Sequence, residues 1–219
     1  MSKIGYTKVI CACCKQTVQI KRIFSFSSDM VGLDGNRHNP LQYELEECPE
    51  CHFTALDISD NGIQVTKEML NAFHIKAGCD QIQTSEFTAL LKAADIYEKN
   101  RKPLLQAYML RLASFYAEEQ MEISLSRNLL RMADTVLQMY FESIENMTLE
   151  DTATAIYLID GNRRLGMKTA AIEMCDDLLL LLKELAESKE AGDIRKILEF
   201  EKMLIENNDT KEHLIEEAM

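Results

Sequence analysis

The sequence of 219 residues contains no tryptophan, only three prolines and only eight glycines. Proline and glycine disfavour helices most strongly, so their scarcity favours a mainly helical chain. Long apolar runs are lacking as well. The longest run of leucines covers residues 178–182, whereas about 20 apolar residues are needed to span a bilayer.

The start of the chain shows no secretory signal, because residues 1–6 reach the first cysteines before an apolar signal core could form. We therefore expect a cytoplasmic protein without a membrane segment. Thiols stay reduced in that compartment, so paired cysteines indicate metal binding or redox chemistry before structural disulfides.

Positive charge is scarce, since 24 Lys and Arg stand against 36 Asp and Glu and the formal net charge is −12. Most of the negative excess lies in residues 61–219. Affinity for nucleic acid depends largely on neutralising phosphates. The acidic balance therefore argues against nucleic-acid binding by the chain as a whole. Residues 1–37 are a local exception, with six Lys or Arg against two Asp, and a partner of this stretch could be anionic.

Alternating patterns predict a small β domain over residues 1–60. Residues 6–26 are expected to form strands around a turn, and residues 29–40 are rich in turn signals. Residues 41–47 alternate cleanly and lead directly into Cys48. The apolar residues expected on one face of the first strands are Val18, Ile20, Phe24 and Phe26.

After about residue 63 the hydrophobic period changes from two to 3.6 residues, which indicates helices. Seven helices with short joins favour stacked helical hairpins of TPR-like (tetratricopeptide-like) type over residues 61–208, and a plain helical bundle fits the pattern equally well. Residues 209–219 form an acidic C-terminal tail. The helices are expected at 65–73, 87–97, 103–115 and 125–140, after Thr148, and at 171–185 and 194–205.

Four cysteines stand in two Cys-x-x-Cys pairs, Cys11/Cys14 and Cys48/Cys51. The two-residue spacing lets one tight turn present both sulfurs to the same ion, and two pairs complete the four thiolates of a closed tetrahedral zinc site. Both pairs adjoin predicted strands, as in a zinc ribbon. We therefore predict one structural Zn²⁺ ion, with a redox or unmetallated role of these thiols as the alternative.

Two features depart from the usual zinc ribbon. The 33 residues between the pairs exceed the usual spacing of about 15–20, although loop-closure entropy grows only logarithmically with length. Lys15 and His52 follow the two pairs at positions where glycine often stands, because glycine tolerates a left-handed backbone.

Other thiols and imidazoles are weaker candidates. Cys13 is a spare thiol beside the first pair, and it is either a strand residue that points elsewhere or a reactive thiol and substitute ligand. His38 lies in the turn-rich stretch, and His52 adjoins Cys51, so neither is well placed to ligate the same ion. The cysteines expected to be buried as small apolar residues of helices are Cys79 and Cys175.

No catalytic constellation is visible in the sequence. Four thiolates leave a zinc ion no open position, and no nucleophile, phosphate-loop or dinucleotide motif occurs, so an enzyme is not the favoured interpretation. Arg163 and Arg164 precede a predicted turn at a helix end, where cations meet the helix dipole favourably. Alternatively, these two arginines line a groove and bind a carboxylate of a partner.

Three stretches carry a likeness to a known family: residues 8–14, residues 39–51 with the strand Asn-Pro-Leu-Gln-Tyr before the second cysteine pair, and residues 157–166. Together they resemble a bacterial family catalogued as domain of unknown function 2225. The resemblance implies a zinc ribbon with the four cysteines as ligands, followed by TPR-like helices, and it implies no activity. The chain departs from the family in lacking proline after Cys11 and glycine after both pairs.

Three functions remain open. The first is a non-enzymatic interaction or scaffold protein that receives a peptide or helix in a groove between helices, with a homo-oligomer compatible. The second is a regulator whose ribbon contacts nucleic acid in a salt-dependent manner. The third is a thiol-redox or metal-sensing protein that uses Cys13 with the pairs. The cations of the second hypothesis are Lys3, Lys8, Lys15, Lys21, Arg22 and Arg37.

Overall fold

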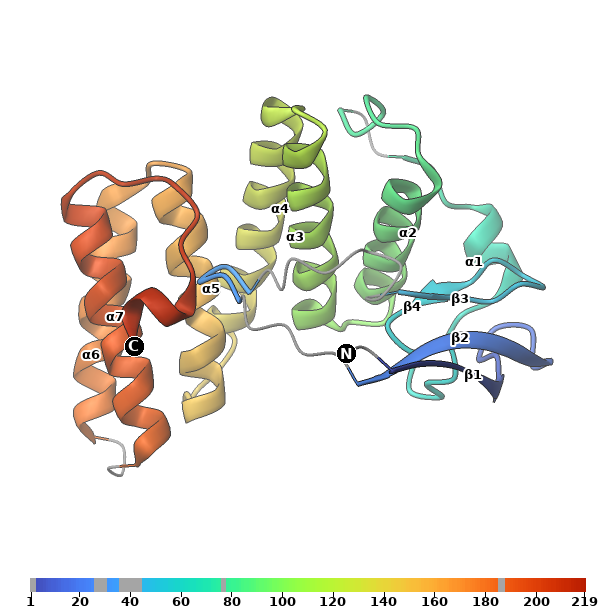
Figure 1. The fold of residues 1–219 in the computed structure, drawn as a ribbon, viewed down its shortest axis with the longest axis horizontal. Helices are drawn as coiled ribbons and strands as arrows, with labels where there is room; N and C mark the ends of the chain where they lie inside the picture. The colour runs from blue at the N-terminus through green and yellow to red at the C-terminus, as the bar shows by residue number, and fades with distance from the viewer. Residues whose placement is uncertain (1–2, 26–30, 36–44, 76–77, 185–187) are drawn as a thin grey trace. The chain divides into compact units, whose positions relative to one another are not determined.

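The computed structural model describes residues 3–25, 31–35, 45–75, 78–184 and 188–219. The predicted fold class is confirmed, because the described chain is mainly helical with a small antiparallel hairpin and a cysteine cluster near its start (Figure 1). The chain forms two compact units, each discontinuous in sequence. The N-terminal unit comprises residues 1–28 and 39–133, and the C-terminal unit comprises 29–38 and 134–219. The domain boundary expected at residue 60 stays a prediction.

The N-terminal unit begins with the hairpin of β1 (Lys3–Ile10) and β2 (Thr17–Ser25). The strands pair antiparallel, with Val18 opposite Val9 and Ile20 opposite Thr7. Val18 and Ile20 are buried, as their alternation predicts, whereas the side chains of Phe24 and Phe26 lie outside the described part. A second short hairpin joins β3 (Glu46–Glu47) and β4 (Thr54–Ala55). Of the strand expected at 41–47, residues 41–44 are not described.

The second hairpin is tied to the first helical pair. Helices α1 (Lys67–Asn71), α2 (Ser85–Lys99) and α3 (Pro103–Glu119) follow it, and α4 (Ile123–Glu142) continues into the C-terminal unit. Tyr97 of α2 is buried, and its hydroxyl accepts a hydrogen bond of 3.1 Å from the amide of Leu56, just after β4. The β part of this unit therefore rests on α2.

Three connections between helices share one geometry. In each, a residue with left-handed φ follows the helix: Arg101 (53°) after α2, Met121 (63°) after α3 and Gly166 (78°) after α5. This is the Schellman ending, in which the next amide bonds back to a carbonyl of the last turn. Those bonds run from Lys102 to Tyr97, from Glu122 to Ala117 and from Met167 to Asn162, at 2.9, 2.9 and 2.8 Å.

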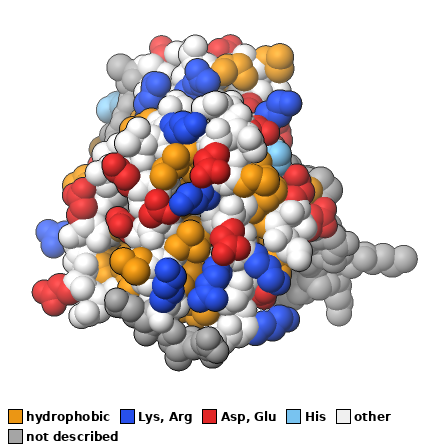
Figure 2. Space-filling model, turned by 90° about the vertical axis from the view of Figure 1, so that its left-hand side faces the viewer, with side chains coloured by type: hydrophobic (Ala, Val, Ile, Leu, Met, Phe, Trp, Pro, Cys, Tyr) orange, Lys and Arg blue, Asp and Glu red, His pale blue; other side chains and the backbone are white. Residues whose placement is uncertain are grey.

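The C-terminal unit packs α5 (Leu149–Arg164), α6 (Lys168–Glu184) and α7 (Lys189–Glu206) around an apolar core. The predicted cap at Thr148 is confirmed, since Thr148 and Asp151 form a reciprocal capping box. Figure 2 shows the side of the molecule formed by α6 and α7, where apolar side chains lie scattered among both signs of charge. None of the helices described in the structure is long and apolar enough to cross a membrane.

The segment between the two cysteine pairs contributes to the core of the C-terminal unit. Leu33 is fully buried there, and its amide donates to the carbonyl of His213 at 2.9 Å. The amide of Ile215 donates to the carbonyl of Val31 at 2.8 Å. Residues 209–219, expected as an acidic tail, thus pack against residues 31–35 and include a short 3-10 helix, η2 (Ile215–Ala218).

Candidate metal centre

The structure brings the four predicted ligands together. Cys11 and Cys14 lie in the turn after β1, and Cys48 and Cys51 lie in the turn between β3 and β4. Their sulfur atoms all lie within 4.8 Å of one another. Cys11 and Cys48 are fully buried, and the second cysteine of each pair is half-buried.

The two cysteine turns have the same hydrogen bonds. In the first turn, the amide of Cys11 donates to the carbonyl of Gln16, and the amide of Lys15 donates to the carbonyl of Cys11, both at 3.0 Å. The second turn repeats these bonds between Cys48 and Phe53 and between His52 and Cys48, both at 2.9 Å. The site therefore consists of two equivalent halves.

Lys15 and His52 adopt the left-handed backbone that glycine usually provides in such turns, with φ of 60° and 56°. The left-handed conformation costs a residue with a Cβ about 1–2 kcal/mol. Both turns nevertheless form at these two non-glycine positions, with equivalent hydrogen bonds.

The sulfur separations fit a metal and do not fit a disulfide. Sγ of Cys11 lies 3.7 Å from Sγ of Cys51, and Sγ of Cys14 lies 3.8 Å from Sγ of Cys48. A tetrahedron with Zn–S bonds of about 2.3 Å has edges of about 3.8 Å, whereas a disulfide bond measures about 2.0 Å. The donor set of four thiols thus matches a tetrahedral soft-metal site.

The environment disfavours ionisation of the two thiols of the second pair. Burial is the main reason that the pKa of Cys51 is raised far above its usual range, and the neighbouring thiols raise it further. Burial also raises the pKa of Cys48. For Cys14 burial acts in the same direction, but hydrogen bonds from the Gln16 amide and from other thiols outweigh it and lower the pKa. A bound metal ion would deprotonate coordinating thiols outright.

An ion-pair cluster holds the two hairpins beside the site. The guanidinium of Arg22 on β2 donates to Glu46 on β3 at 2.5 Å and to Asp57 after β4 at 3.0 Å. Glu46 also accepts from the amide of Ile58 at 3.2 Å. Sequence reasoning counted Arg22 among the cations for a partner, because no local pattern reveals these two carboxylates.

The weaker candidate ligands are placed differently. The ring of His52 bonds to Glu47 at 2.7 Å, and its side chain is 71% exposed. His38 lies outside the described residues. Cys13 is half-buried beside the pairs, where burial raises the pKa of its thiol and a hydrogen bond with Cys51 acts in the opposite direction. Cys79 and Cys175 are buried, as predicted; Cys175 lies on α6, whereas Cys79 lies in the loop before α2 and not in a helix.

Arg163 is buried. This burial contradicts the alternative interpretation, in which Arg163 lines a groove and binds a partner. Its side chain is 1% exposed and forms ion pairs with Asp160 on α5 and with Glu201 on α7. It also donates to the backbone carbonyls of Asp209 and Lys211 at 2.7 and 2.8 Å. Arg164 donates to Asp34 at 2.7 Å and is mostly buried, so both arginines bind the chain's own segments.

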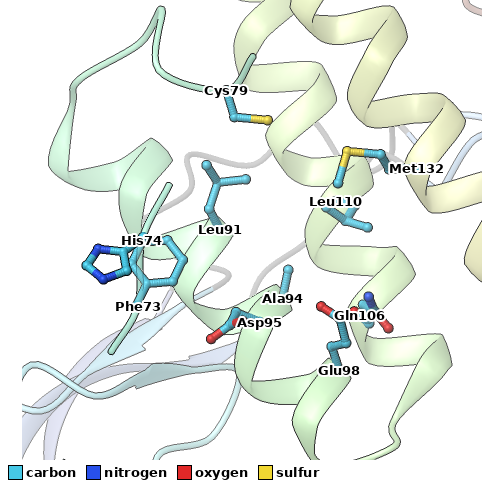
Figure 3. A pocket seen from close by; sticks show the side chains of 10 residues that line it. All are labelled: Phe73, His74, Cys79, Leu91, Ala94, Asp95, Glu98, Gln106, Leu110 and Met132. Carbon is cyan, nitrogen blue, oxygen red and sulfur yellow. The ribbon is translucent and has the colours of Figure 1, made fainter. Parts of the chain in front are cut away.

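A small cavity lies between the helices of the N-terminal unit (Figure 3). Its volume is about 30 Å³, which is room for one or two water molecules. Leu91 of α2, Leu110 of α3 and Met132 of α4 line its apolar side, together with Cys79. Because of its size, we regard this cavity as a packing defect and not as a ligand site.

Comparison with known proteins identifies no relatives. No protein-family model, no curated protein and no solved structure matches the chain. The assignment of this site therefore depends on its geometry.

Proposed function

We propose that the chain binds one Zn²⁺ ion through the thiolates of Cys11, Cys14, Cys48 and Cys51. The observation that carries this proposal is the pair of sulfur separations, 3.7 and 3.8 Å, which match the edge of a zinc tetrathiolate tetrahedron of about 3.8 Å. Zinc is preferred among soft metals because four thiolates in a closed site are its usual structural ligand set.

The proposed role of the ion is structural. Four thiolates leave no coordination position for a substrate or water. The ion would cross-link the turn after β1 to the turn before β4, beside the Arg22 ion pairs with Glu46 and Asp57 and the hydrogen bond of 2.7 Å from the Ala12 amide to the Ile58 carbonyl. Because such a site does not exist in the unfolded chain, the binding free energy of the metal becomes folding free energy of the ribbon.

For the whole chain we propose a non-enzymatic, cytoplasmic interaction or scaffold protein. The repeated Schellman turn after α2, α3 and α5 supports stacked helical hairpins of TPR-like type. Such stacks offer extended surfaces to protein partners. Membership of the family of domain of unknown function 2225 is part of the same proposal, on the likeness of residues 8–14, 39–51 and 157–166.

The first test is the zinc content of the purified full chain by elemental analysis, under reducing conditions and without chelators. We expect about one zinc per chain, lost in Cys48→Ser and retained in Cys13→Ser. The second variant is a matched control, because it removes a neighbouring thiol of the same turn. Metal-free wild-type protein, or equal loss in both variants, would refute the four-thiolate site.

A further inference from the structure

The β1–β2 hairpin has one uncovered edge. The sheet contains β1 and β2 alone, and Arg22 joins β2 to β3 on the other side, so the outer edge belongs to β1 (Figure 1). Within the described part of the chain, no backbone hydrogen bond joins β1 to any segment except β2. Tyr6 and Ile10 of β1 are 70% and 59% exposed, and Lys8 between them is exposed as well.

The register of the hairpin shows which residues of β1 direct their backbone groups outward. In an antiparallel pair, residues that bond across to the partner strand alternate with residues whose N–H and C=O point away from it. The amide of Cys11 donates to the carbonyl of Gln16 across the hairpin, and this pair continues the register of β1 and β2. Every second residue before Cys11 therefore bonds to β2, whereas Tyr6, Lys8 and Ile10 direct their backbone groups to the outer edge.

A bare edge of this kind can pair with a further strand. Natural sheets often block such an edge with a proline, a bulge or a very short strand. β1 is eight residues long and contains no proline and no acidic residue, and its pairing with β2 is regular from Ile4 to Ile10. A lysine on an edge also discourages pairing, so a strand that binds here has to place a suitable residue opposite Lys8.

We infer that the outer edge of β1 binds the same edge of a second copy of the chain, antiparallel and with the two-fold axis at Thr7. The sequence of β1 is self-complementary in this register, because Tyr6 of each copy comes opposite Lys8 of the other. Both residues direct their backbone groups outward, so each such pair exchanges both of its hydrogen bonds. The ammonium group of Lys8 then meets the ring of Tyr6 in a favourable cation–π contact.

The other residues of β1 agree with this register. On the opposite face of the strand, Thr7 meets Thr7 of the second copy, and threonine pairs on neighbouring strands are favourable. Gly5 comes opposite Val9 and leaves room for its side chain. An axis at Lys8 would instead place the two Lys8 side chains directly opposite each other, which destabilises a strand pair. An axis at Tyr6 would separate Lys8 from the ring.

An extended acidic peptide is the competing occupant, since a carboxylate opposite Lys8 would also suit this edge. A free peptide has to be ordered when it binds, which costs conformational entropy. A second copy presents a strand that is already held extended by β2, so it loses less. We therefore favour the second copy and make the acidic peptide an outcome of the test. The inference rests on the proposed function, because it names a partner for an interaction protein and because the metal site fixes the turn after β1.

The test is sedimentation velocity of the full, zinc-loaded chain at about 1 to 200 μM. One strand pair is a small interface, so we expect a reversible dimer with a dissociation constant of about 10–100 μM. Lys8→Pro removes an outward amide and leaves the bonds between β1 and β2 in place, and it is expected to abolish the dimer. Lys8→Ala keeps the amide and should weaken the dimer only about tenfold. Tyr6→Ala should weaken it to the same extent, whereas Tyr6→Phe keeps the ring and the dimer.

The matched control is Lys183→Ala, which removes one exposed lysine from α6 of the C-terminal unit and should leave the dimer unchanged. Zinc content is measured for every sample, so that loss of the dimer in zinc-loaded protein contradicts the inference and not the metal site. Zinc-loaded wild type that stays monomeric at the highest concentration would overturn the inference, whether or not it binds added polyglutamate. A dimer that persists in folded Lys8→Pro, or equal effects of Tyr6→Ala and Tyr6→Phe, would also overturn it.

Discussion

The substitution Glu201→Gln is expected to remove a pH dependence from the C-terminal unit. Arg163 joins two buried carboxylates, those of Glu201, at 2.9 Å, and Asp160. Each carboxylate has a second oxygen, Oε1 of Glu201 and Oδ2 of Asp160, that is buried and has no hydrogen-bond partner among the described residues. One guanidinium therefore pairs with two carboxylates. A proton on one of these carboxylates would supply the hydrogen bond that the two unpaired oxygens lack.

Burial is the main reason that the pKa of Glu201 is raised to about 8, and the charge of Asp160 raises it further while Arg163 opposes the shift. A protonated Glu201 can donate from Oε1 and so satisfy a carboxylate oxygen of Asp160. Between pH 4.5, the usual value for Glu, and pH 8, the folded unit thus binds a proton that the unfolded chain has lost.

Because the folded-state pKa is raised, this contribution to stability is complete below the unfolded pKa and is lost as the pH rises through the folded pKa. The free energy of unfolding decreases by about 1.4 kcal/mol per pH unit inside the window. From pH 6 to pH 8 the wild-type unit is therefore expected to lose about 2 kcal/mol of stability. Glutamine has the shape of protonated Glu201 and does not titrate, so the variant should lose much less.

The assay is hydrogen–deuterium exchange of α7 and residues 209–219 at pH 6 and pH 8, corrected for the intrinsic exchange rate, together with denaturant unfolding at both pH values. The control is Glu199→Gln, which removes an exposed carboxylate from the same helix and should follow the wild type. A pH dependence of Glu201→Gln equal to that of the wild type would show that the shared proton does not exist.

Further predictions concern the packing and the ribbon. Leu33→Ala is expected to destabilise the C-terminal unit by about 2–5 kcal/mol, because Leu33 is fully buried; unchanged denaturation would contradict its place in the core. Lys15→Gly and His52→Gly should each stabilise the zinc-loaded ribbon by about 1 kcal/mol by relieving the left-handed strain, measured as slower zinc transfer to a chelator. Arg22→Ala should accelerate that transfer, because Arg22 bridges the two hairpins, whereas Lys8→Ala, at an exposed position of β1, should not.

Local sequence patterns were sufficient where the cause of the structure is itself local. The alternation around Val18 and Ile20 predicts which side of the β1–β2 hairpin is buried. The spacing of Thr148 and Asp151 predicts the N-terminal cap of α5. The two-residue spacing within each cysteine pair likewise predicts the turn that presents both of its thiols. These features require no knowledge of distant parts of the chain.

Features that depend on distant partners could not be predicted. Arg163 has the pattern of a cation at a helix end, and its burial follows only from the position of Glu201 on another helix. Leu33 stands in a turn-rich stretch, where no periodicity marks it as a core residue. In both cases the partner lies far along the sequence, and the pattern within a window of ten or twenty residues does not reveal it.

The burial of Leu33 has a consequence for the order in which the chain folds. Leu33 is synthesised long before the backbone groups that bind its segment, at His213 and Ile215. Contacts of such long sequence separation form slowly because the loop must first be closed. During synthesis the two cysteine turns are complete once Phe53 and β4 have emerged, whereas the C-terminal unit has to wait for residues 209–219. A fragment that starts at residue 61 would lack Leu33 in the core of its C-terminal unit. A fragment limited to residues 1–60 would expose Leu33 to solvent.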